Sequence, residues 1–130
     1  MASPRPTATC LKRLFTALRS VRVREVGLDE VELHKHISQA LTQAGIAHRR
    51  EYAFAPRCRA DFWIEPGIVI EVKKRRPDRA KLTVQLTRYA QVPTVRYLVV
   101  MLEKSISLEP VLEGVPVRVV SMNAAWGVAV

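Results

Sequence analysis

Hydrophobic residues follow a helical period in two segments of the chain and a strand-like pattern in several others. The first helix is expected from an N-cap signal at Leu28-Asp29 to about Ala44, where Gly45 ends it. A second helix is expected over residues 79–90, with Asp78 as its N-cap. The strand-like segments are residues 50–55, 59–64, 68–73, 96–102 and 115–122.

The order of these elements is a helix, three strands, a helix and two strands. This order predicts an α/β fold in which a central mixed sheet is flanked by helices. Residues 105–114 are expected to form a loop or a short helical turn. The strand after the helix of residues 79–90 is expected to return through a right-handed crossover.

The N-terminal segment is basic. Residues 1–24 contain no acid, and their basic residues are Arg5, Lys12, Arg13, Arg19, Arg22 and Arg24. A short amphipathic helix is predicted there by apolar residues at helical spacing, namely Leu11, Leu14, Phe15 and Leu18. We therefore expect a basic arm with a short helix over residues 1–27, followed by one domain over residues 28–130. The short helix either docks on that domain or lies along a nucleic acid.

The amino-acid composition indicates the broad class of protein. The chain has 130 residues, of which 48% are hydrophobic and 25% charged, as in a single globular domain. No apolar run reaches the length of a membrane span, so we expect a soluble protein. Cys10 and Cys58 make neither a disulfide framework nor a four-ligand zinc site, which favours a reducing cytoplasm. The Arg-rich start is also typical of a transit peptide and leaves the mitochondrial matrix as an alternative.

The net charge of the chain indicates which kind of partner it binds. The formal net charge is +9 and the isoelectric point is about 10.3. Such a surplus favours an acidic partner, and nucleic acid is the commonest one. A basic surface with no partner is the alternative. The sequence holds no Gly-rich phosphate loop and no serine-type triad, and we expect no small-molecule cofactor.

Two acids and a lysine are expected to meet on a hairpin. Residues 65–67 (Glu-Pro-Gly) are a turn signal, and a three-residue loop there places Asp61 directly opposite Glu71. Lys73 follows Glu71 by two residues and shares its face of the strand. The same register pairs Ile64 with Ile68 and turns the apolar set into the core, namely Phe62, Ile64, Ile68, Ile70 and Val72.

Two adjacent carboxylates repel each other, and a cation relieves that repulsion. Magnesium prefers oxygen ligands, retains waters for a substrate phosphate, and activates a water for attack on a phosphodiester. Lys73 then orients the attacking water or stabilises charge on the phosphate. The alternative is a weak cross-strand ion pair on a solvated face. The apolar run of residues 68–70 argues against that alternative, because it indicates a central strand.

The combination of Asp61 with Glu71-Val72-Lys73 resembles the motif of the PD-(D/E)xK nuclease superfamily, which includes restriction endonucleases, Holliday-junction resolvases and phage nucleases. The resemblance covers residues 29–89. It implies a restriction-endonuclease-like core and Mg²⁺, for which Mn²⁺ can substitute. The metal would be held by Asp61, Glu71 and the Val72 carbonyl, and Lys73 would assist catalysis.

The resemblance also implies supporting residues on the two helices. A glutamate is expected at Glu30, because Glu30 lies on the core-facing apolar stripe of the first helix, and Glu32 is the alternative. A glutamine is expected at Gln85. Gln85, Arg88 and Tyr89 are helical neighbours that would converge on a phosphate, although Tyr89 can equally be a core aromatic. The sequence departs from the motif at Ala60, where the family has a proline, and this slightly weakens the resemblance.

We therefore expect a metal-dependent DNA endonuclease, in a bacterial or phage-infected cell, that hydrolyses phosphodiesters with metal-activated water. Contacts to the DNA backbone are expected from Lys74, Arg75, Arg76, Arg79, Arg88 and Tyr89. Because a domain this small covers little duplex, cutting of both strands would favour a homodimer. His34 and His36 are expected at the surface, since residues two apart on a helix point in different directions.

Two other classes of protein fit parts of the sequence. A non-catalytic nucleic-acid-binding module would use the basic cluster that starts at Lys73 and would have no need for the two acids. An assembly protein would use the apolar C-terminal residues 126–130 as a contact. The sequence is compatible with either DNA or RNA as the substrate and with either one metal ion or two.

Overall fold

The computed structural model describes residues 4–21 and 29–122. Its helices are α1 (Ala8–Arg19), α2 (Glu30–Gln43) and α3 (Arg79–Ala90). Its strands are β1 (Arg49–Ala55), β2 (Cys58–Ile64), β3 (Ile68–Lys73), β4 (Tyr97–Leu102), β5 (Val111–Leu112) and β6 (Val115–Ser121). Arg22, Arg24, Leu28 and residues 126–130, which entered the expectations above, lie outside the described residues.

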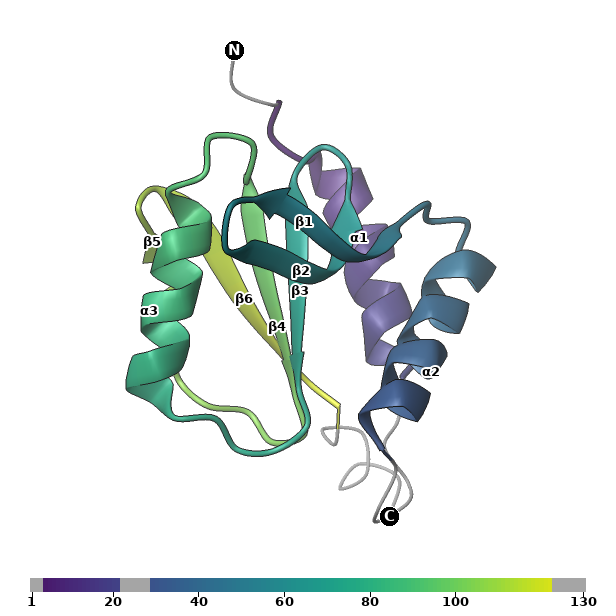
Figure 1. Cartoon of the computed structure of the whole chain (residues 1–130). Coiled ribbons are helices and arrows are strands. Elements are labelled where there is room, and N and C mark those ends of the chain that lie inside the picture. Colours follow the sequence, from purple (N-terminus) through teal and green to yellow (C-terminus); the bar gives the residue numbers. More distant parts are fainter. Residues whose placement is uncertain (1–3, 22–28, 123–130) are drawn as a thin grey trace.

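The predicted α/β fold with a mixed sheet is confirmed. The six strands form one sheet in the order β1-β2-β3-β4-β6-β5 (Figure 1). Strands β1, β2 and β3 pair antiparallel, whereas β3, β4 and β6 pair parallel. The pair β5–β6 was not predicted; it lies at the end of the segment that was expected to be a loop or helical turn.

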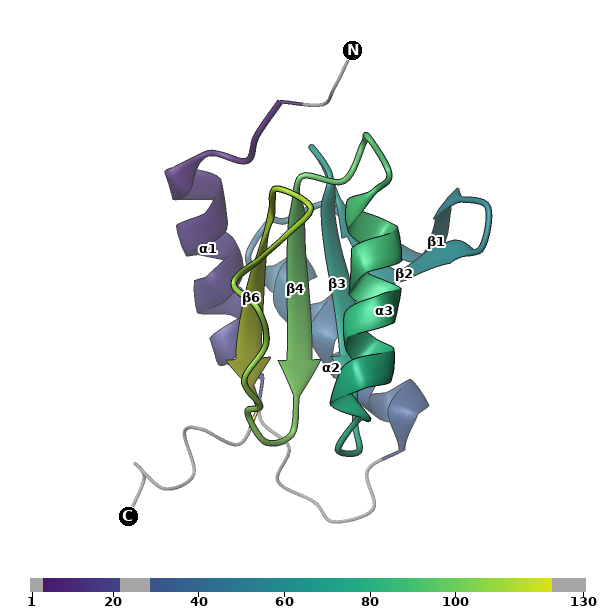
Figure 2. The same cartoon turned by 90° about the vertical axis from the view of Figure 1, so that its left-hand side faces the viewer.

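Helices cover both faces of the sheet. Helices α1 and α2 pack on one face with Phe62, Ile70 and Met101, while α3 packs on the other with Val69 and Val100 (Figures 1 and 2). Strands β3 and β4 are therefore buried on both sides, which explains their unbroken apolar sequence. No helix in the described part of the chain is long and apolar enough to cross a membrane.

Aspartates begin α2 and α3, as predicted. The carboxylate of Asp29 accepts a hydrogen bond from the Glu32 amide, and that of Asp78 accepts one from the Lys81 amide. The N-terminal helix α1 is docked, because its apolar side chains share the buried cluster of α2 and the sheet. The N-terminal ends of α2 and α3 lie at the same end of the molecule as the C-terminal ends of β3 and β4 (Figure 1).

The β2–β3 turn is fixed by a close approach to the start of β4. Gly67 has a φ of 131°, and its carbonyl accepts hydrogen bonds from the amides of Arg96 and Tyr97 at 2.8 and 3.2 Å. A Cβ atom at this position would overlap the carbonyl oxygen of Thr94. Only glycine fits both the dihedral angle and the space.

We expect Gly67→Ala to destabilise the protein by about 3 kcal/mol or more, because it adds overlap to an unfavourable φ. Gly114→Ala is the matched control, since Gly114 also has a positive φ (76°) but has open space around its Cβ position. That control should cost about 1 kcal/mol. Urea denaturation measures both values, and equal losses would contradict the role given to the close approach.

Candidate active site

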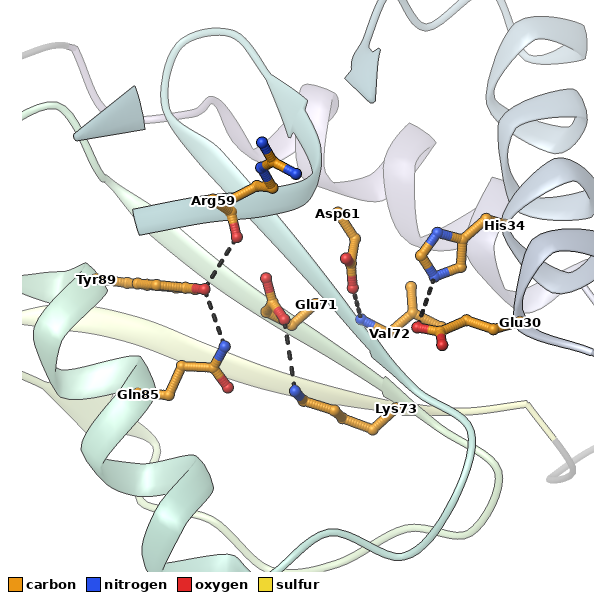
Figure 3. Close-up of polar contacts among 9 residues, drawn as sticks. All are labelled: Glu30, His34, Arg59, Asp61, Glu71, Val72, Lys73, Gln85 and Tyr89. Carbon is orange, nitrogen blue, oxygen red and sulfur yellow. Dashed lines mark hydrogen bonds and ion pairs between the residues drawn. The ribbon is translucent and has the colours of Figure 1, made fainter. Parts of the chain in front are cut away.

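The site begins where strand β2 separates from strand β3. The predicted register is confirmed for the pairs that form, with Ile64 opposite Ile68 and Phe62 opposite Ile70. The ladder ends at that last pair, so the predicted Asp61–Glu71 strand pair does not form, although both side chains line one cavity. The next amide on β3 that faces β2 belongs to Val72, and it donates instead to Oδ2 of Asp61 at 2.7 Å. The carboxylate of Asp61 thus replaces a strand partner and is held against the end of β3 (Figure 3).

Glu71 and Lys73 complete the group predicted on the hairpin. Only 4% of Glu71 is exposed, and its Oε2 lies 3.8 Å from Nζ of Lys73. The other oxygen, Oε1, is buried and has no hydrogen-bond partner among the described residues. Asp61, Glu71 and Lys73 line one cavity of about 680 Å³ (Figure 3).

Electrostatics in this cavity disfavour two full negative charges. Burial raises the pKa of Glu71 to about 8, the charge of Asp61 adds to the rise, and the Lys73 ammonium opposes it. Burial also raises the pKa of Asp61, while the hydrogen bond from the Val72 amide acts against that rise. Lys73 therefore neutralises the pair only in part, and the site has room for further positive charge.

The oxygen atoms present fit a hard divalent cation. Glu71 contributes the unpartnered Oε1, and Asp61 retains one oxygen that is free of the Val72 amide. The N–H and C=O of a strand residue point to the same side, so the Val72 carbonyl also faces the place where β2 has left. Within residues 4–21 and 29–122, no three His, Cys, Asp or Glu side chains gather as a metal cluster.

Helix α2 presents its first turn to the cavity. Glu30 lines the cavity and Glu32 does not, which favours Glu30 over Glu32 as the helix carboxylate. The expectation that Glu30 faces the core is wrong, because its side chain is 68% exposed. The helix begins at this residue, and its first turn lies beside the cavity mouth rather than against the sheet.

The surface position expected for His34 is also wrong. His34 is buried with its ring 5.6 Å from that of Phe62, and its Nε2 lies 3.7 Å from Oε1 of Glu30 (Figure 3). His36 is exposed, as expected. The sequence holds a signal for this position, because His34 lies between Leu33 and Ile37 and widens their apolar stripe.

On helix α3, side chains that were expected to bind a phosphate form hydrogen bonds with each other and with β2 instead. Gln85 lines the cavity, and its Nε2 donates to the Tyr89 hydroxyl at 2.9 Å. That hydroxyl donates to the Arg59 carbonyl at 2.9 Å, and Tyr89 is 3% exposed (Figure 3). The predicted convergence of Gln85, Arg88 and Tyr89 on a phosphate is therefore not found. Tyr89 is a core residue, and Arg88 is exposed with its guanidinium over the Tyr89 ring.

Basic residues surround the mouth of the cavity. Lys74, Arg75 and Arg76, which were predicted to grip a nucleic acid, line it directly. Arg79 does not line it; its guanidinium donates to the carbonyl of Ser107 at 3.4 Å. Lys81 also lines it; the sequence placed Lys81 in the basic cluster of a non-catalytic binding module, but not among the contacts expected of a nuclease. Its signal in the sequence is its place in the first turn of α3, which begins beside the end of β3.

Because the Tyr89 hydroxyl donates to the Arg59 carbonyl, we expect its removal to lower the free energy of unfolding. Tyr89→Phe leaves the partly buried Arg59 carbonyl without this donor and should lower the free energy of unfolding by about 1 kcal/mol. Tyr52→Phe is the control, since the Tyr52 hydroxyl makes no hydrogen bond within the described part of the chain. Chemical denaturation should show a change below about 0.5 kcal/mol for that control. Equal effects would show that the hydrogen bond to Arg59 contributes nothing.

The pKa of Glu71 predicts a pH-dependent stability in the absence of metal. The folded state holds this proton up to about pH 8, whereas an unperturbed glutamate releases it near 4.5. Unfolding therefore becomes easier as pH rises between these values, by at most about 5 kcal/mol in total. Glu71→Gln cannot ionise and should be more stable than the parent above pH 8.

Thermal melts of the metal-free protein at a series of pH values measure this effect. Glu32→Gln is the matched control, because Glu32 is exposed and should leave the pH profile unchanged. Parallel profiles for Glu71→Gln and the parent would contradict the assignment.

Comparison of the chain with models of known families, with curated proteins and with solved structures found no match. An assignment of activity therefore depends on the chemistry of the site itself. The fold class is that of an α/β protein with a six-stranded mixed sheet and three helices among the described residues.

Proposed function

We propose that the chain is a metal-dependent DNA endonuclease of the PD-(D/E)xK type. The observation that carries this proposal is the buried, partnerless oxygen of Glu71 beside the carboxylate of Asp61, with Lys73 in the same cavity. A basic protein that only binds nucleic acid would be weakened by two acids at its phosphate site, because they repel the backbone. Acids there become useful once a cation joins them to a phosphate.

Each residue of the cavity has a definite part in this proposal. Asp61, Glu71 and the Val72 carbonyl would hold magnesium or manganese. When bound, such an ion polarises a phosphodiester and lowers the pKa of a water. Lys73 projects its ammonium beside Glu71, where it can orient a water or stabilise negative charge on the phosphate. Gln85, held by Tyr89, and Glu30, at the mouth, would orient water and substrate.

The surroundings of the cavity suit a phosphate backbone. Lys74, Arg75 and Arg76 at its mouth would contact phosphates, with Arg79 and Arg88 farther out on α3. The helices α2 and α3 both begin beside the cavity, and their N-terminal ends carry partial positive charge. Both features favour an anionic polymer over a neutral substrate. Double-strand cutting by this domain would involve two copies of the chain.

Cleavage assays with magnesium or manganese test the proposal. Plasmid, single-stranded and four-way-junction DNA serve as substrates for the parent and for Asp61→Asn and Lys73→Ala. We expect the parent to cut and each variant to lose about 100-fold or more in rate. Asp61→Asn is preferred to alanine because an amide oxygen can still accept the hydrogen bond from Val72.

Glu30→Gln and Glu32→Gln form a matched pair for the helix carboxylate. Glu30 lines the cavity and Glu32 does not, so Glu30→Gln should slow cutting while Glu32→Gln leaves the rate unchanged.

Cutting by Asp61→Asn at the parental rate would contradict the proposal. DNA binding without cutting under either metal would instead support a non-catalytic nucleic-acid-binding module.

A further inference from the structure

The β1–β2 hairpin carries positive charge that the proposed function does not use. It extends from the body of the sheet past α3 (Figure 2). Residues 49–60 hold one acid, Glu51, and four exposed arginines, namely Arg49, Arg50, Arg57 and Arg59. None of the four forms a salt bridge within the part of the chain that the structure describes. Their charge is therefore available to a partner.

The hairpin packs against α3 through aromatic side chains. The Phe54 ring lies 5.3 Å from that of Trp63 and 5.1 Å from that of Tyr89, which it meets edge-on. Tyr52 packs on Trp63 from the same strand as Phe54. An element fixed in this way loses little conformational entropy when it binds a ligand.

The hairpin is also tied to the candidate site. Arg59 precedes Asp61 by two residues on β2, and its carbonyl is fixed by Tyr89, which in turn holds Gln85 of the cavity. Figure 3 shows the Arg59 guanidinium directed away from Tyr89 and Glu71. In the view of Figure 3, Arg59 and Lys73 lie on opposite sides of the two acids. The basic residues of the cavity mouth follow Lys73 in the sequence. A polyanion that crosses the cavity would thus meet positive charge on both sides.

We propose that the β1–β2 hairpin is a second DNA-binding element, which lies in a groove of duplex DNA beside the phosphate at the cavity. This inference rests on the proposed function and names its substrate class as double-stranded DNA. A two-stranded β-ribbon fits the major groove of a duplex, whereas a single strand offers no groove. Arg57 at the turn and Arg59 beside the site would contact phosphates on the strands that border the groove.

Binding measured in EDTA tests the hairpin without requiring cleavage. The probe is a fluorescein-labelled 20-base-pair duplex of mixed sequence, compared with its single strand, over a series of salt concentrations. We expect Arg57→Gln/Arg59→Gln to bind the duplex roughly tenfold more weakly. The slope of log K against log salt should fall by about two, close to 0.9 for each lost phosphate contact.

Two further variants make the outcome decisive. Lys12→Gln/Arg19→Gln removes the same charge from α1 and should bind as the parent does, while Arg57→Lys/Arg59→Lys should retain most of the affinity. The proposal is overturned if the hairpin variant binds like the parent, if the α1 variant loses as much, or if single strands bind as tightly as the duplex. It is overturned too if the parent does not bind duplex. Cleavage with magnesium, measured separately, tests the activity of the cavity whichever result the hairpin gives.

Discussion

A single hydrogen bond, from the Val72 amide to the Asp61 carboxylate, takes the place of the next rung of the β2–β3 ladder. Because a side chain satisfies this amide, β2 can turn away from β3 without leaving a buried donor unpaired. The turn away lets the β1–β2 hairpin project from the sheet. It also opens the cavity in which Glu71 and Lys73 face Asp61.

The same arrangement buries the carboxylate of Glu71 at a position where it does not stabilise the fold. Strand β3 is apolar on both faces up to Ile70, and Glu71 continues it with an ionisable group that is 4% exposed. An apolar residue there would extend the packing of Val69 and Val100 against α3. A buried acid with an unpartnered oxygen persists in proteins mainly at sites where charge is used, at a cost in stability.

The sequence predicted those parts of the site that depend on local pairing. The turn at residues 65–67 and the apolar alternation around it set the hairpin register. Continuing that register past its last pair predicted that Asp61 and Glu71 share one site, and both line the cavity. Helices α2 and α3 and the mixed sheet followed from hydrophobic period and caps. Strand β5 was missed because two residues leave no periodic signal.

The remaining errors concern how helices meet the sheet. His34 was placed at the surface, yet the packing of α2 against Phe62 buries it. Spacing alone allows Tyr89 to lie in the core or at the surface, and its contacts with Phe54 and the Arg59 carbonyl place it in the core. Such choices depend on tertiary contacts between residues far apart in the chain, which periodicity does not encode.

Asp61, Glu71, Lys73 and Gln85 all come from the continuous unit β2–β3–α3. Their encounter depends on short loop closures, which are fast and low in entropic cost. The residues of the cavity can therefore come together early in folding, before β6 adds the outer parallel strand. A unit of this kind also tolerates changes in the segments that flank it, because its geometry is set within its own stretch of chain.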